Sequence, residues 1–221
     1  MTFDGFPVEM IDFYEGLEAD NSKTYWTAHR DVYETAVKAP MEALLAALAD
    51  EFGPATFFRP YRDVRFSKDK SPYKTAAAAI VSGTAGGNAG LYLQVSADGL
   101  LVGGGYHGMA SDQVDRYRRA VVDDRHGARL ETLLKKLVDH GFEINGEQLK
   151  RPPRGYTADS PRLPLLRRKS LHAGRDWPTD EVLHSAAVLD RVASAWRRLA
   201  PLNAWLDTSV GPSDQPALGR R

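Results

Sequence analysis

Hydrophobic side chains recur at helical spacing near both ends of the chain, which predicts amphipathic helices there. In the first half the pattern covers residues 8–20, 21–33 and 40–52. It returns in two helices over residues 111–141, and then in a long helix from Thr179 that is followed by a short one containing PLNAWL. We therefore expect helices both before and after the middle of the chain.

The middle of the chain alternates between apolar and polar residues, as strands do. Residues 90–102 alternate and contain an Asp-Gly dipeptide at 98–99, which suits the loop of an antiparallel hairpin. Residues 61–66 (YRDVRF) also alternate, and Arg62 falls on the same face as the two apolar residues. Local rules allow either a short helix or a strand of small residues at 71–83. Together these segments predict an antiparallel sheet.

Length and composition are those of one globular domain. The chain has 221 residues, no cysteine, a formal net charge of zero and no apolar stretch long enough to span a membrane. Its first residues do not resemble a secretory signal, so we expect a cytoplasmic protein without a membrane partner. We predict a single α+β domain at residues 1–207, and a disordered tail at 208–221 because that segment has little apolar content.

Charge is sorted along the chain even though it sums to zero. Residues 1–20 contain acidic side chains and no Lys or Arg, whereas residues 59–74 carry six basic and two acidic side chains. A second basic segment, residues 150–175, has eight basic residues against one acidic residue. The neutral total argues against a protein that coats nucleic acid with its whole surface.

Most signatures of known chemistry are absent from the sequence. Residues 103–108 (GGGYHG) match the spacing of a dinucleotide-binding loop, but a hairpin precedes them and the required βαβ context is missing. We interpret them as a tight bend that lets a ligand or another backbone come close, next to a helix at Ser111 that could offer a weak anion site. The six histidines have no metal-ligand spacing, and no P-loop or hydrolase motif occurs. We expect neither a metal nor a cofactor.

The segment from Arg62 to Lys74, RDVRFSKDKSPYK, is the densest cluster of charge, and we call it the basic block. One hypothesis is that its arginine forks and lysine charges converge on an anion such as a phosphate ester, with its two carboxylates orienting them. The alternative is a solvated turn whose charges pair with each other, at about 0–1 kcal/mol per pair. Charge pattern alone slightly favours the turn.

The second basic segment also allows two interpretations. It could form a strip that binds the backbone of nucleic acid, with Tyr156 and Trp177 stacking on bases. It could instead be a polar connection, stiffened by prolines and irregular over residues 145–178. We favour the connection, because no nucleic-acid motif is visible.

Several segments together resemble domain-of-unknown-function family 2461, which is found in bacteria and fungi. The resemblance rests on FDGFP near the start, the helix with Trp26 and Arg30, the basic block, the strand with Tyr92, the three glycines from residue 103, the helix with Arg118 and the closing PLNAWL. It implies an α+β fold with an antiparallel sheet flanked by N-terminal and C-terminal helices. In that fold the basic block joins two strands, so residues 75–81 become a strand. The resemblance implies no activity.

We take as the leading hypothesis a pocket for a phosphorylated or other anionic small molecule, in which catalysis is an open possibility and no catalytic residue is assigned. A second hypothesis is a non-enzymatic interaction module that docks nucleic acid or an acidic protein segment through its basic face. A third is a structural block, in which Arg62 and Asp63 tie a strand to the acidic first helix. The candidate ligand-binding residues are Arg62, Asp63, Arg65, Lys68, Asp69, Lys70, Tyr73, Lys74, Gly104 and Gly105.

Overall fold

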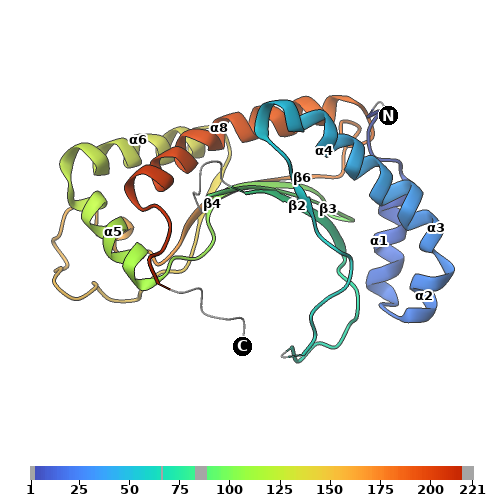
Figure 1. Ribbon diagram of the computed structural model, residues 1–221, viewed down its shortest axis with the longest axis horizontal. Coiled ribbons are helices and arrows are strands. Elements are labelled where there is room, and N and C mark those ends of the chain that lie inside the picture. Colours follow the sequence, from blue (N-terminus) through green and yellow to red (C-terminus); the bar gives the residue numbers. More distant parts are fainter. Residues whose placement is uncertain (1–2, 66, 83–88, 216–221) are drawn as a thin grey trace. The chain divides into compact units, whose positions relative to one another are not determined.

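The computed structural model describes residues 3–65, 67–82 and 89–215 (Figure 1). It contains a six-stranded antiparallel sheet with the strand order β1-β2-β3-β4-β6-β5, and helices precede and follow the sheet in the chain. The α+β fold class is therefore confirmed. No helix within the described residues is long and apolar enough to cross a membrane.

The chain forms two compact units. Strands β3, β4 and β6 and helix α8 each have residues in both units. The prediction of a single domain at residues 1–207 stays a prediction. Unit 1 consists of Met1–Val81, Tyr92–Val102 and Asp176–Ala195, and unit 2 consists of Ser82–Leu91, Gly103–Arg175 and Trp196–Arg221.

The N-terminal helices of unit 1 form where the apolar spacing predicts them. The first helix buries Met10, Phe13, Tyr14 and Leu17. Ser22 caps the second, where its hydroxyl accepts a hydrogen bond from the backbone N–H of Tyr25 at 3.1 Å. The helices are α1 (Glu9–Ala19), α2 (Lys23–Ala28), α3 (Arg30–Val32), the π-helix η1 (Tyr33–Lys38) and α4 (Ala39–Phe52).

The helical turns from α3 to α4 are continuous, so Pro40 does not start a separate helix as predicted. A π-helical stretch precedes Pro40, which lies in the first turn of α4. Proline has no N–H to donate, so the pairing changes close to it. As predicted, α4 ends at Gly53, which adopts a φ of 88°.

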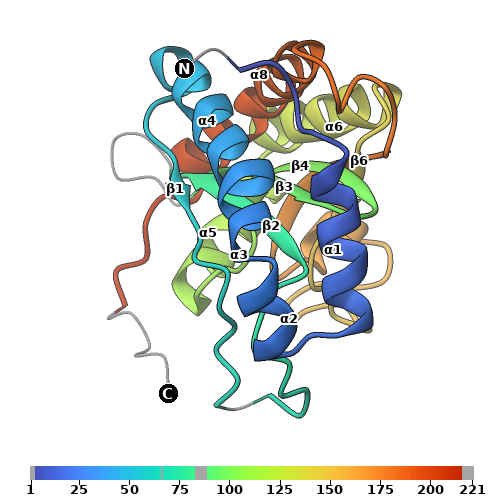
Figure 2. The same ribbon diagram turned by 90° about the vertical axis from the view of Figure 1, so that its right-hand side faces the viewer.

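The basic block joins two neighbouring strands, as the resemblance implies. β1 (Thr56–Phe57) pairs antiparallel with β2 (Ala76–Val81), which confirms the strand predicted at 75–81. Helix α4 lies over one face of β2, and the loop between β1 and β2 extends past the ends of these strands (Figure 1, Figure 2).

The strand predicted over residues 61–66 is wrong. Tyr61 makes an isolated bridge to Tyr73, and the described residues from 62 to 72 contain no strand. Two carboxylates accept hydrogen bonds from the backbone here: Asp63 from the N–H of Arg65, and Asp69 from the N–H of Ser71. Such contacts form turns and compete with strand pairing. Phe66, whose facing was also predicted, lies outside the described residues.

The hairpin of β3 (Gly90–Ser96) and β4 (Gly99–Tyr106) confirms the predicted alternation, since Leu91, Leu93 and Val95 are buried. Its two loop residues are 97 and 98 rather than the predicted 98 and 99. Gly99 begins β4 with a φ of 120°, and a side chain there would lie only 2.3 Å from the carbonyl oxygen of Trp177.

The helices predicted over 111–141 lie in unit 2, whereas the segment predicted to be irregular, 145–178, contains a strand that begins in unit 2. Residues 171–178 form β6, which pairs antiparallel with β5. In β6, Leu171 and Ala173 are buried, as expected of an alternating strand. The prolines and charged residues that precede it make this alternation hard to recognise in the sequence. On α6, the apolar side chain of Val138 is 55% exposed. The elements are α5 (Ser111–Val122), α6 (Asp124–Asp139), β5 (Glu143–Asn145), α7 (Leu163–Leu166) and β6 (Leu171–Pro178).

The last helix, α8 (Ala187–Ser209), differs from the prediction at both ends. It begins after 179, because Asp180 holds a turn by accepting from the N–H of Leu183 and pairing with Arg191. It then continues through Pro201, so PLNAWL is part of it rather than a separate helix. Beyond α8, residues 210–215 lie against α5, and residues 216–221 of the predicted tail lie outside the described residues.

Candidate functional site

Tyr73 anchors the basic block to the N-terminal helices of unit 1. The side chain of Asn21 donates to the carbonyl of Tyr73 (3.1 Å) and accepts from its N–H (3.0 Å). The Tyr73 ring stacks on Trp26 with centroids 4.3 Å apart and planes 7° apart, and Tyr73 is only 5% exposed. Its burial raises the pKa of the phenol. Tyr73, which was predicted to bind ligand, therefore also holds its end of the basic block against the N-terminal helices.

Four charged residues of the basic block pair with each other; we call residues 63–70 of the block its tip. Arg62 bonds to Asp69, and Arg65 bonds to both oxygens of Asp63 at 2.9 and 2.7 Å. The contact with Arg65 lowers the pKa of Asp63 to about 2, and bonds from Ser71 and then Arg62 lower that of Asp69. The hypothesis that Arg62 and Asp63 tie a strand to the acidic first helix is therefore wrong.

The two remaining tip lysines are exposed. Lys70 donates to the carbonyl of Val64 at 2.9 Å. Lys68 makes no hydrogen bond or ion pair within the described part of the chain. The tip therefore behaves largely as the self-paired, solvated turn that the charge pattern favoured.

The base of the block lines a cavity of about 490 Å³ in unit 1. Strands β2 and β3 supply much of the lining, and the alternating alanines of β2 leave the space open because their side chains are small. None of its lining residues in the described ranges is acidic. They are Phe58, Arg62, Tyr73, Lys74, Thr75, Ala76, Ala78, Tyr92 and Gln94.

Lys74 is the cation most clearly placed in this cavity. Its ammonium donates to the carbonyl of Arg59 (2.9 Å) and lies 5.2 Å from the centroid of the Phe58 ring. It has no carboxylate partner among the described residues. Burial, and then the positive charge of Arg59, lower its pKa. An anion beside Lys74 would therefore supply a missing counter-charge.

Polar groups from β3 face the same cavity. The hydroxyl of Tyr92 donates to Oε1 of Gln94 at 2.7 Å, which leaves the nitrogen of that amide as a further donor. Burial raises the pKa of Tyr92, so its hydroxyl stays protonated. Sequence patterns do not associate these two residues with the block, because the association depends on the pairing of β2 with β3.

Gly104 and Gly105 lie within β4 rather than in the predicted bend. A side chain at 105 would lie 2.5 Å from the carbonyl of Leu171, and one at 104 would lie 3.2 Å from Leu199. Both glycines thus allow close packing inside unit 2. The helix predicted near Ser111 has its own cap, since the side chain of Gln113 accepts from the N–H of Ala110.

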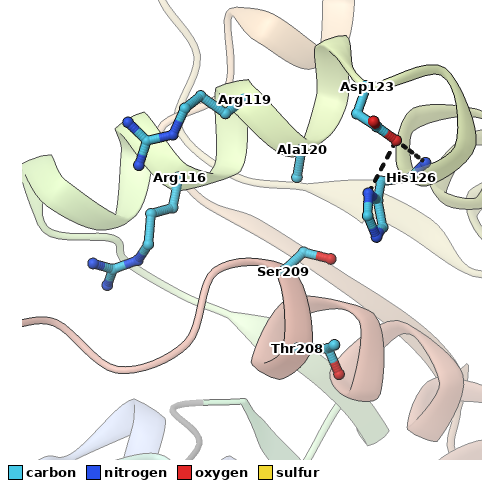
Figure 3. Close-up of a pocket in the computed structure, with 7 residues that line it drawn as sticks. All are labelled: Arg116, Arg119, Ala120, Asp123, His126, Thr208 and Ser209. Carbon is cyan, nitrogen blue, oxygen red and sulfur yellow. Dashed lines mark hydrogen bonds and ion pairs between the residues drawn. The ribbon is translucent and has the colours of Figure 1, made fainter.

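A second cavity, of about 330 Å³, lies in unit 2 (Figure 3). Arg116 is already engaged by Asp112 (3.1 Å) and Asp214 (2.9 Å). Asp123 caps α6 and lies 3.0 Å from Nδ1 of His126. Because a carboxylate, Asp123, is part of its lining, this cavity suits an anion less well than the first. The lining is Arg116, Arg119, Ala120, Asp123, His126, Thr208 and Ser209.

A third cavity, of about 380 Å³, has Trp26 and Arg30 in its lining. Both line it together with other aromatic side chains of unit 1. Glu34 and Glu42 are also in the lining, and Glu34 pairs with Lys38 at 2.7 Å. Its charges are therefore mixed, which again makes the first cavity the better anion site.

The second basic segment uses much of its charge within unit 2. Arg162 pairs with Glu131 (2.9 Å), Lys169 pairs with Glu147, and Arg167 donates to the carbonyl of Leu149 (2.6 Å). These contacts support the interpretation as a polar connection. Within the described chain, no three metal-ligating side chains gather into a group.

Comparison with known proteins gives a family. The model of a family described as "Conserved hypothetical protein (DUF2461)" matches residues 9–205, which confirms the resemblance seen in the sequence. The matched range includes the whole basic block and all the described residues that line the first cavity. No curated protein and no solved structure matches the chain.

Proposed function

We propose that this chain, which belongs to the conserved hypothetical protein family DUF2461, binds a small anionic molecule such as a phosphate ester. The site is the cavity between the basic block and strands β2 and β3. One observation carries the proposal: Arg62 and Lys74 share a cavity of about 490 Å³, and none of the described residues that line it is acidic. Ligand pockets commonly have volumes of about 300–1,000 Å³, so a small molecule fits this space.

The two cations would serve different purposes. Lys74 offers a compact charge that lacks a carboxylate partner, whereas Arg62 offers a planar fork. Asp69 holds one arm of that fork, and the other N–H groups are available for phosphate or carboxylate oxygens. Phe58 and the alanines of β2 supply an apolar surface for the rest of the ligand. Arg65, Lys68 and Lys70 are not part of the lining.

For a reaction in this cavity, Lys74 is the group with suitable chemistry. Its lowered pKa leaves more of the amine neutral at a given pH, and a neutral amine is a nucleophile.

The alternative is a non-enzymatic module that docks nucleic acid or an acidic protein segment. The exposed Arg65, Lys68 and Lys70 at the tip of the block are the observation that favours it. A docking face of this kind needs no cavity, however, and it would bind through many weak charge contacts that salt screens. The presence of the cavity makes us prefer the small-molecule function.

Calorimetric titration with a panel of phosphate esters and nucleotides tests the proposal. Lys74→Gln is the informative variant, and Lys70→Gln is its matched control because it removes the same charge from the same block outside the cavity. A charged hydrogen bond contributes about 1.5–3 kcal/mol, so we expect about tenfold or greater weakening in Lys74→Gln. The control should bind within about twofold of the wild type, as expected of an exposed charge.

Two results would contradict the proposal. The first is that no member of the panel binds the wild type. The second is an equal loss of affinity in both variants together with steep salt dependence, which would instead support the docking module.

A further inference from the structure

Within the described part of the chain, three polar side chains near the start of β6 have buried atoms that make no hydrogen bond. These atoms are Oη of Tyr117, Nε of Arg168 and Nδ1 of His172. Tyr117 is fully buried and Arg168 is 9% exposed. Buried polar atoms in native proteins nearly always have a partner, so three such atoms in one region indicate that something else completes their bonding.

The charge of Arg168 is also uncompensated. Its Nη1 and Nη2 donate to the backbone carbonyls of Asn145 (2.9 Å) and Ile144 (3.4 Å), and it makes no ion pair with any described carboxylate. Arg118 adds positive charge nearby and donates its Nε to the carbonyl of Leu166 (3.1 Å). Burial of a guanidinium without a counter-charge is costly. The region therefore favours an anion over a neutral group.

Backbone contacts bring the three side chains into one region. Asn145, whose carbonyl accepts from Arg168, pairs with His172 between β5 and β6, and Arg118, the neighbour of Tyr117, donates to the carbonyl of Leu166. Burial raises the pKa of Tyr117, and the charge of Arg168 opposes part of that rise. Burial, His107 and Arg168 together lower the pKa of His172. The rings of His172 and His107 are 4.9 Å apart, and His107 is exposed, so the cluster can be reached from the surface on this side.

We infer that Tyr117, Arg168 and His172 form a binding site for a compact monovalent anion, either a halide or a carboxylate group. A phenol, a guanidinium Nε and an imidazole Nδ1 can each donate a hydrogen bond, so one anion can accept all three. A single negative charge neutralises the single buried guanidinium, whereas a dianion would leave a buried excess charge. The site lies within unit 2 and does not depend on the function proposed for the cavity of unit 1.

Thermal unfolding of the full chain tests this inference. The probes are sodium chloride and sodium formate, each varied against sodium isethionate at constant ionic strength, since the isethionate anion is larger. We expect the melting temperature of the wild type to rise saturably with one or both probes, because a ligand that binds the folded state stabilises it. A response to chloride alone identifies a halide site, and a response to formate identifies a carboxylate site.

Tyr117→Phe removes one donor and little else. Without a probe anion it should be as stable as the wild type or more stable, because its hydroxyl has no partner to lose. It should need about tenfold more anion for the same rise, which is the effect of a lost hydrogen bond to a charged group. Tyr106→Phe is the matched control: it loses a real bond to Asp207 (2.8 Å), so it should be less stable and keep the full response to anion.

Three outcomes would overturn the inference. One is a wild type that does not respond to either probe. Another is an identical response in the wild type and Tyr117→Phe. The third is a Tyr117→Phe variant that is destabilised without any anion response, which would mean that ordered water alone bonds these atoms. A Lys74→Gln variant should keep the response, so failure here is distinguishable from failure of the proposed function.

Discussion

Replacing Asn21 by alanine should release the basic block from the N-terminal helices. The Asn21 side chain makes two hydrogen bonds to the backbone of Tyr73, which is only 5% exposed. Its loss leaves one buried N–H and one buried carbonyl without partners, at about 1–3 kcal/mol each. Because the loop can relax and admit some water, we expect a combined loss of about 2–4 kcal/mol in the free energy of unfolding.

Urea denaturation measures this loss, and two variants make it specific. Asn21→Asp keeps an acceptor for the N–H of Tyr73 but loses the donor, so it should fall between the wild type and Asn21→Ala. Ser22→Ala removes the neighbouring helix cap and should cost about 1 kcal/mol without disturbing the block. Asn21→Ala should also weaken anion binding, because the block then loses its fixed position.

An Asn21→Ala variant that is no less stable than Ser22→Ala would contradict the anchoring role of Asn21. An Asn21→Ala variant that loses stability but binds anions as tightly as the wild type would contradict the link to binding. In the second case, the anchoring of Tyr73 would have no bearing on the cavity.

Other predictions concern glycine packing, an acidic pKa and a surface position. Gly105→Ala should lower the free energy of unfolding by about 2–5 kcal/mol, because Gly105 has a φ of 128° and a side chain there would clash with Leu171. Gly108→Ala should change it by no more than about 0.5 kcal/mol, because no atom lies within 4 Å of the added carbon. Thermal unfolding measures both, and equal losses would contradict the prediction. An NMR titration should give Asp63 a pKa of about 2 that returns toward 3.8 in Arg65→Ala. Since the folded pKa is the lower one, the stability from this pair is present above about pH 4 and is lost as the pH falls through about 2; an unchanged pKa in the variant would count against the pairing. Val138→Lys should leave the melting temperature nearly unchanged, because Val138 is 55% exposed, and a marked fall would show that it is part of the core.

Most helices and strands that have a clear hydrophobic periodicity in their own residues are predictable from the sequence. The spacing of Met10, Phe13, Tyr14 and Leu17 is enough for α1, because one helix face supplies the signal. The strand at β2 was ambiguous on local rules, and only the resemblance to a family decided it. Residues 61–66 alternate like a strand, yet side-chain bonds to the backbone form turns there, and a pattern of hydrophobicity does not report such competition.

The candidate site was predictable only in part. The basic block was found from its composition and the resemblance, and two of its cations, Arg62 and Lys74, line the cavity. The opposite wall, with Tyr92 and Gln94, comes from strand pairing that the sequence does not specify. Gly105 was placed in the ligand site because a glycine permits close approach of either a ligand or a backbone, and its neighbour in the structure is the backbone of β6.

The most direct test of the central claim is the pKa of the Lys74 ammonium, measured by NMR with and without the tightest phosphate ester. In the free protein this pKa should lie below the ordinary value of 10.5, because the group is partly buried and has Arg59 nearby. If the anion binds beside Lys74, its pKa should rise on binding, and the same rise should occur in Lys70→Gln. A bound ester that leaves the pKa of Lys74 unchanged would contradict the claim that this cavity is the anion site.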